Sequence, residues 1–92
     1  MITAIVMIHV NADRIPEAAQ AIAEVPNVSE VYSCAGDVDL VAMVRVREHE
    51  ELADVIAGGV SRVPGVRDTT THIAFRSYSA RDTDAAFSVG LD

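Results

Sequence analysis

A weak internal repeat constrains the fold of this chain more than any other feature. Val25-Pro26-Asn27-Val28 recurs as Val63-Pro64-Gly65-Val66, and each copy lies between a helix-type pattern and a strand-type pattern. A further strand-type pattern precedes each helix. Such self-similarity predicts two copies of a strand–helix–strand unit. Because 92 residues fit a single domain, the two units must share one sheet.

Four strands are expected, over residues 2–10, 28–35, 39–47 and 66–78. The first and the third are apolar at consecutive positions, which is typical of strands that are buried on both faces. Between the second and the third, Gly36-Asp37 predicts a hairpin turn.

Helices are expected after the first and the third strand. The first helix follows Asn11-Ala12-Asp13, which offers a cap, has Pro16 in its first turn and ends before Pro26. The second covers residues 48–62, with apolar side chains at helical spacing and carboxylates in its first half. Its Gly59 is expected to let the helix approach the sheet closely. A third, short helix is expected over residues 79–87.

The fold class that follows is α+β: a ferredoxin-like βαββαβ sandwich whose antiparallel sheet has the strand order 4-1-3-2. Both helices then cover one face of the sheet. The other face stays uncovered, and the pattern leaves open which set of side chains points outward. Because an uncovered apolar face marks an interface, two subunits are expected to stack sheet on sheet. We expect a folded domain over residues 1–80 and an acidic tail over residues 81–92.

The charge pattern excludes several classes of partner. The chain has fourteen acidic residues and seven arginines, no lysine, and a formal net charge of −7. Nucleic-acid backbones and anionic membranes both attract basic surfaces, so neither direct nucleic-acid binding nor membrane docking is expected. The absence of lysine, together with many Ala, Val, Arg and Asp residues, indicates a GC-rich genome, and we expect a bacterial source. Cys34 stands alone, and no segment has the pattern of a leader or a membrane span, so we expect a cytoplasmic protein.

No sequence motif predicts catalysis. The chain has no Gly-x-Ser-x-Gly element and no phosphate-binding glycine-rich loop. His9 and His72 lie on strands that are expected to be neighbours, so they could meet as metal ligands; alternatively, both are ordinary half-exposed histidines of a sheet. We expect no catalytic residue, no metal and no cofactor.

The hairpin is the segment best suited to a binding site. It runs from Cys34 to Asp39, and its candidate binding residues are Gly36, Asp37, Val38 and Asp39. Backbone N–H groups of a glycine turn can hold a carboxylate, and Asp37 or Asp39 can accept from an ammonium group. The same residues also suit an ordinary turn.

Three consecutive threonines lie on the last expected strand: Thr69, Thr70 and Thr71. Their hydroxyls could add to a pocket beside the hairpin. Alternatively, they are there because threonine has a high β-propensity.

These segments together resemble a known family. Residues 1–78 are similar to a stand-alone ligand-binding (RAM) domain of the Lrp/AsnC family. The resemblance rests on Val63-Pro64-Gly65-Val66, on Val31-Tyr32-Ser33 leading into Gly36-Asp37-Val38-Asp39, on Leu40-Val41-Ala42-Met43-Val44, and on Thr69-Thr70-Thr71.

The resemblance implies a ferredoxin-like fold whose dimers form through their sheets and assemble into rings, often octamers. It also implies that amino-acid effectors bind in clefts between dimers. The hairpin of the family contributes to that cleft, so Gly36, Asp37, Val38 and Asp39 carry over as effector-binding positions, although the family commonly has an aromatic residue or His where Val38 stands. The family's helix-turn-helix has no counterpart here. Any effect on DNA would therefore run through a partner, such as a full-length Lrp/AsnC regulator.

Three functions compete at this point. The first is a non-enzymatic, ligand-sensing and oligomerising domain of a transcriptional regulator. The second is a small dimeric α+β barrel enzyme, monooxygenase-like, which needs a pocket under each sheet with a His or Asp inside. The third is a structural partner that tunes the assembly of a full-length regulator. The position of the cavity discriminates between the first two.

Overall fold

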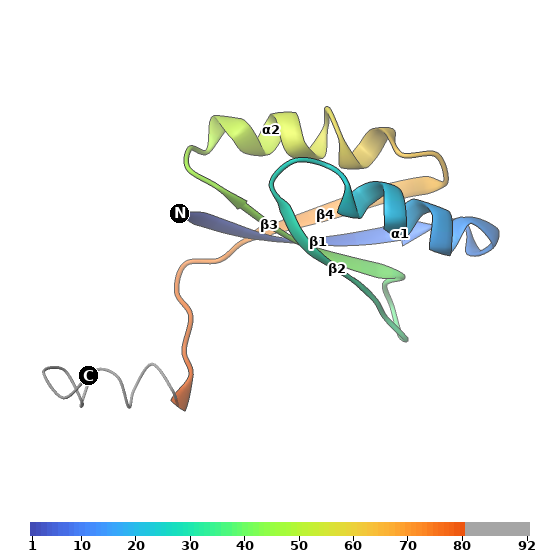
Figure 1. Cartoon of the computed structure of the whole chain (residues 1–92). Helices are drawn as coiled ribbons and strands as arrows, with labels where there is room; N and C mark the ends of the chain where they lie inside the picture. Colours follow the sequence, from blue (N-terminus) through green and yellow to red (C-terminus); the bar gives the residue numbers. More distant parts are fainter. Residues whose placement is uncertain (81–92) are drawn as a thin grey trace, which may run out of the picture.

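The computed structural model describes residues 1–80 of the chain. Its elements are β1 (Ile2–Val10), the 3₁₀ turn η1 (Ala12–Arg14), α1 (Ile15–Ala23), β2 (Val28–Ser33), β3 (Leu40–Val46), α2 (Glu50–Ile56), the 3₁₀ turn η2 (Val60–Arg62) and β4 (Val66–Ile73). The strands form one antiparallel sheet in the order β2-β3-β1-β4, and both helices lie on one side of it (Figure 1). The predicted order 4-1-3-2 is the same order taken from the other edge. The ferredoxin-like fold is therefore confirmed.

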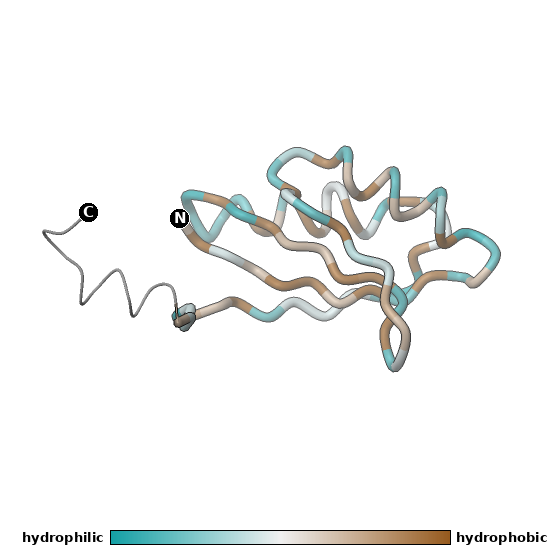
Figure 2. The backbone as a smooth tube through the Cα atoms, turned by 60° about the horizontal axis from the view of Figure 1, so that its bottom comes forward, coloured by the Kyte–Doolittle hydropathy of each residue, from teal (hydrophilic) through white to brown (hydrophobic). Residues whose placement is uncertain are grey.

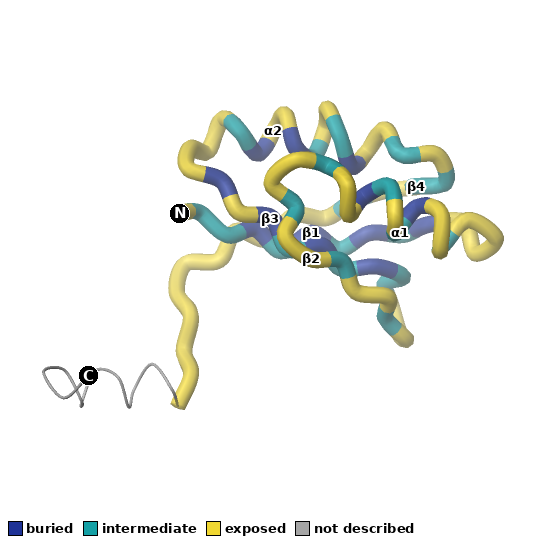
Figure 3. Tube along the Cα trace, in the orientation of Figure 1, coloured by how far each residue is buried: buried dark blue, intermediate teal, exposed yellow. Residues whose placement is uncertain are grey.

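The hydrophobic core lies between the sheet and the two helices (Figure 3). β1 and β3 contribute alternate residues to it, and both helices contribute their inward-facing residues. The fully or nearly fully buried side chains are Ala4, Val6, Ile8, Val10, Ala18, Ile22, Leu40, Ala42, Val44, Val46, Leu52, Val55 and Val60. No polar side chain is buried anywhere in residues 1–80. Burial of each larger aliphatic side chain contributes about 1.5–3 kcal/mol, so this layer is the main source of stability.

The opposite face of the sheet is open. Paired residues on antiparallel strands point to the same side, so the pairs Ile5–Met43 and Met7–Val41 lie together on this face. These four side chains are half-buried in the single chain. Figure 2 shows that hydrophobic residues run along the strands as well as the helices. The structure thus settles which set of side chains points away from the helices.

Both copies of the repeat form the same turn. The Val28 N–H donates to the Val25 carbonyl at 3.1 Å, and the Val66 N–H donates to the Val63 carbonyl at 3.1 Å. The third residue of each copy has a positive φ, 75° at Asn27 and 96° at Gly65. A proline followed by a residue with positive φ is the pattern of a type II β-turn. Each helical segment therefore leads into its next strand through an equivalent turn.

The second helix is shorter than predicted. The sequence predicted one helix over residues 48–62, whereas a turn at Gly58-Gly59 separates α2 from η2. Gly59 adopts φ −125° and ψ −75°, which lies outside the helical region. A Cβ atom at Gly59 would lie 2.7 Å from Val25 Cγ1. The close approach at this glycine is therefore to Val25, and not to the sheet as expected.

The last strand also ends earlier than predicted, at Ile73 and not at residue 78. The Ala74 N–H still donates to the Thr3 carbonyl at 2.9 Å, but β1 begins at Ile2 and offers little further backbone to pair with. Residues 74–80 leave the sheet on the side away from the helices (Figure 1), with Phe75 and Tyr78 exposed.

Smaller differences concern the ends of the other elements. β2 ends two residues before the expected position 35, and β3 lacks one residue at each end of the expected range 39–47. Asn11 makes no side-chain cap; its carbonyl accepts from the Arg14 N–H at 2.8 Å instead. Pro16 lies in the first turn of α1, as predicted. The acidic tail over residues 81–92, and with it nearly all of the short helix expected over residues 79–87, lies outside the described residues.

Candidate functional site

The hairpin of residues 36–39 connects β2 to β3 beside the point where β1 ends. Two backbone hydrogen bonds hold it: Cys34 N–H donates to the Asp39 carbonyl at 2.9 Å, and Asp39 N–H donates to the Ile8 carbonyl at 3.1 Å. Gly36 has φ 124°, and a Cβ atom there would meet nothing within 4 Å. The backbone conformation favours glycine at this position, while the space around it is open.

The Asp39 carboxylate has a structural role. Its Oδ2 accepts from the Val10 N–H at 2.9 Å. β1 has a register shift between His9 and Val10, where the ladder with β4 is interrupted. The carboxylate thus supplies a partner to a backbone donor beside this irregularity. The side chain of Asp37, in contrast, is exposed.

His9 joins the hairpin to β4. Its Nδ1 lies 2.6 Å from Asp68 Oδ1, and its Nε2 lies 2.7 Å from the Asp37 carbonyl oxygen. The hydrogen bond with Asp68 is the largest cause that raises the pKa of His9 above its ordinary value, followed by the bond with the Asp37 carbonyl. The ring therefore holds its proton to a higher pH than a free histidine does.

The three threonines are not on one face of the sheet. Thr69 pairs with Ile8 and Thr71 with Val6, so both lie on the helix side, whereas Thr70 pairs with Met7 on the open side. Leu40 of β3 also pairs with Ile8, from the other edge of β1. β1 therefore separates the start of β3, and the hairpin before it, from the threonines. Within one chain, the structure brings the four hairpin residues together but does not bring the threonines to them.

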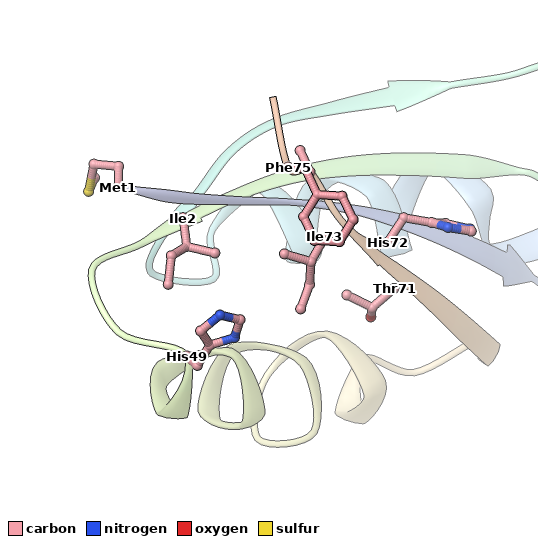
Figure 4. Close-up of a pocket in the computed structure, with 8 residues that line it drawn as sticks. Met1, Ile2, His49, Thr71, His72, Ile73 and Phe75 are labelled. Carbon is pink, nitrogen blue, oxygen red and sulfur yellow. The ribbon is translucent and has the colours of Figure 1, made fainter. Parts of the chain in front are cut away.

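Among the hollows that residues 1–80 line, three open ones lie away from the hairpin. One of about 630 Å³ lies between the start of β1, the end of β4 and the start of α2; Figure 4 shows His49 opposite Ile2 and Ile73, while His72 points away. A second, of about 250 Å³, lies between the end of α1 and α2. A third, of about 750 Å³, lies on the open sheet face. None of the three is lined by the hairpin.

The hollow on the open face bears on the enzyme alternative. It is lined by Met1, Thr3, Ile5, Met43, Arg45, Ala74, Phe75, Arg76 and Ser77. The enzyme alternative needs a His or Asp in such a pocket, and none of the described residues that line this hollow is one. The hollow therefore offers no acid–base pair for the proposed monooxygenase-like chemistry.

A metal site between His9 and His72 does not form in the described chain. His9 pairs with Asp68, whereas His72 pairs with Ile5 further along the same strand pair. Over residues 1–80, no three His, Cys, Asp or Glu side chains converge as metal ligands would. The same residues contain no helix that is both long and apolar enough to cross a bilayer.

Sequence reasoning missed Asp68 and the role of His9. Both residues are visible in the sequence, but their contact depends on the β1–β4 register, which shifts after His9. A weak signal did exist, since an acidic residue shortly follows the second Val-Pro turn and a histidine lies next to the end of the neighbouring strand. Without the register, many other pairings were equally open.

Known proteins are similar to this chain in sequence and in fold. The family model described as "Lrp/AsnC ligand binding domain" matches residues 3–84. The regulator named "HTH-type transcriptional regulator FL11" from Pyrococcus horikoshii is 32% identical over 75 residues, covering 82% of this chain and 49% of that protein. This chain thus spans about half the length of that curated relative. Pyrococcus is archaeal, so this relative does not support the expected bacterial source.

Two solved structures have the same fold. The crystal structure of TTHA0845 from Thermus thermophilus superposes with a TM-score of 0.81 at 48% identity, covering 86% of this chain and 99% of that one. A feast or famine regulatory protein from M. tuberculosis, complexed with L-methionine, has a TM-score of 0.72 at 26% identity, covering 88% of this chain and 55% of that one. The match over residues 3–84 shows that the chain belongs to the Lrp/AsnC ligand-binding domain family.

Proposed function

We propose that this domain is a non-enzymatic sensor that binds an amino acid, or a similar small effector, at seams between dimers and acts in the cytoplasm on transcription. The single observation that carries the proposal is the exposed hairpin of residues 36–39, which is anchored at the end of the sheet and lines none of the three hollows described above. A ligand at this hairpin needs walls from a second copy. That requirement fits a site at a seam between subunits.

The chemistry of the hairpin suits an α-amino acid. Its open glycine turn offers backbone N–H groups to a carboxylate, and the exposed Asp37 carboxylate can accept from an ammonium group. Asp39 is occupied by the Val10 N–H, so we assign it to holding the turn. We propose that the threonines of the edge strand β4 enter such a site from a neighbouring copy, Thr70 from the open face and Thr69 and Thr71 from the helix side. The L-methionine complex of the 26% identical M. tuberculosis regulator supports this ligand class.

The open sheet face supports the assembly. Ile5, Met7, Val41 and Met43 form a half-buried apolar patch that the helices do not cover. Such patches mark interfaces, and a two-fold dimer would place the patch of one copy on the patch of another. We propose this sheet-on-sheet dimer as the unit of a larger ring, of octamer type. Full-length Lrp/AsnC regulators would be partners in mixed rings, through which the domain would influence DNA.

Calorimetry with each of the twenty amino acids tests the sensor. We expect at least one to bind, and we expect Asp37→Asn to weaken that binding about tenfold or more, because a charged acceptor for the ammonium group is lost. Asp54→Asn on α2 removes the same charge on the helix side and should bind as the unchanged chain does. An intact oligomer that binds none of the twenty would contradict the amino-acid proposal.

A further inference from the structure

His9 has an unusual pair of partners. One ring nitrogen faces the Asp68 carboxylate at 2.6 Å and the other faces the Asp37 carbonyl at 2.7 Å. Both partners are hydrogen-bond acceptors. A neutral imidazole has one N–H and one lone pair, so it can satisfy only one of them, whereas an imidazolium donates to both. The geometry therefore fits the protonated ring.

The charged groups around the ring also favour its protonated form. The Asp68 carboxylate faces His9 from β4, and the carboxylate of Asp39 adds a second negative charge, whereas Asp37 contributes its backbone carbonyl alone. These carboxylates stabilise a positive ring. Loss of the proton would leave a nitrogen lone pair directed at an oxygen, and one of the two bonds would break. The carbonyl of Asp37 is the weaker acceptor because it is uncharged, so the hydrogen bond to this carbonyl is the one that breaks.

The Asp37 carbonyl controls the direction of a donor in the proposed site. A trans peptide unit is planar, so the Val38 N–H points opposite to the Asp37 carbonyl. When His9 holds that carbonyl, the Val38 N–H is turned away from the ring and is available to a ligand. When the hydrogen bond between His9 and the Asp37 carbonyl breaks, the plane of the Asp37–Val38 peptide can rotate. The hydrogen bonds of Asp39 anchor the end of the hairpin but do not fix this plane.

We propose that His9 is a positioning residue whose proton holds the effector hairpin against β4 and keeps the Val38 N–H directed toward the ligand, so that the domain senses pH together with its effector. The effect on effector binding rests on the proposed amino-acid site. The two hydrogen bonds by which His9 holds the hairpin, which we call the clamp, do not depend on that site. The clamp makes no contact with the ligand; it acts through the Asp37–Val38 peptide.

The first experiment needs no ligand. Residue-resolved amide exchange by NMR compares the unchanged chain with His9→Gln and with the control His49→Gln, which replaces an exposed histidine at the start of α2. At about pH 6, the hairpin amides should exchange at least about five times more slowly in the unchanged chain and in His49→Gln than in His9→Gln. Between about pH 6 and about pH 8.5 this ratio should fall toward one, because the ring of His9 loses its proton as the pH rises through its raised pKa. Equal hairpin exchange in all three proteins at both pH values would overturn the clamp.

The second experiment adds the effector. Calorimetry uses an amino acid that binds the unchanged chain, at the same two pH values. Its affinity should fall about fivefold or more from about pH 6 to about pH 8.5, beyond the change seen for His9→Gln, where the ligand's own ionisation is the remaining cause. If the amino acid binds but both proteins share one pH profile, the positioning role is wrong. If no amino acid binds at all, the proposed function fails, and the amide exchange alone decides the clamp.

Discussion

Gly65 is constrained in two independent ways. Its φ of 96° is in a region that residues with a Cβ rarely adopt, and an added Cβ would lie 2.7 Å from Arg14 Cβ. Because that neighbour is the base of a side chain, it cannot swing aside. We expect Gly65→Ala to lower the free energy of unfolding by about 2–4 kcal/mol, the sum of backbone strain and contact.

Gly36→Ala is the matched control for this substitution. Its φ of 124° is strained as well, but nothing lies within 4 Å of the added Cβ. It should therefore lose only about 1–3 kcal/mol, from strain alone. Urea unfolding of both variants measures the difference, and a larger loss for Gly36→Ala would contradict the contact.

His9 should make the stability of the fold depend on pH. Its pKa is raised in the folded protein, first by the hydrogen bond with Asp68, above the unfolded value of about 6.5. A raised pKa means that the folded state binds the proton more tightly, so the stabilisation is complete below about pH 6.5 and disappears as the pH rises through the folded pKa. Urea unfolding from about pH 6 to about pH 9 should therefore show the unchanged chain losing its advantage over His9→Gln. Parallel curves over the whole range would contradict it.

At the scale of elements, the start of α2 has a specific hydrogen-bond arrangement. Glu51 Oε2 accepts from the Arg47 N–H at 3.0 Å and from the Glu48 N–H at 3.4 Å. The side chain thus reaches back across the helix start to two backbone donors. We expect Glu51→Ala to lower the free energy of unfolding by about 0.5–1.5 kcal/mol more than Glu50→Ala does. Both variants remove one charge from the first turn of the helix. The difference between their free energies of unfolding in urea therefore measures the contribution of the two hydrogen bonds. Equal losses would mean that only the charge matters.

The elements also show how far the sequence could predict the fold. β1 was predicted to its end residues because its strand-type pattern runs from Ile2 to Val10 and the expected helix cap follows directly at Asn11. α2 was predicted too long, since the apolar spacing continues through Gly58-Gly59 while the backbone there leaves the helical region. β4 was predicted too long because its pattern continues after β1 has stopped supplying partners. Local patterns predict an element, but its end depends on its neighbours.

The candidate site was predictable to the same degree. The hairpin of residues 36–39 follows from Gly36 and its flanking strands, and the structure places a turn there. The bridge from His9 to Asp68 joins residues that are 59 positions apart, and a register shift decides that they meet. No pattern along the chain contains that information. The threonines show the converse, since adjacent residues of one strand point to opposite faces.

At the scale of the whole molecule, the sheet has one covered face and one uncovered face. The helices bury one set of strand residues completely, whereas Ile5, Met7, Val41 and Met43 keep part of their surface in water. A small domain gains stability when such a patch is shared with a second copy. The proposed dimer would therefore form through the same two central strands that supply most of the core.

The dimer yields a direct prediction. Met43→Asp places a carboxylate in the middle of the proposed interface, and a two-fold axis would bring two of them into the same apolar layer, where an unpaired charge is costly. Light scattering after size exclusion should show a dimer or larger assembly for the unchanged chain and a monomer for Met43→Asp. Ala53→Asp adds the same charge to the exposed side of α2 and should keep the original mass. Far-UV circular dichroism checks that both variants stay folded. A monomeric unchanged chain at micromolar concentration would refute the sheet-on-sheet dimer, and with it the seam at which we place the effector.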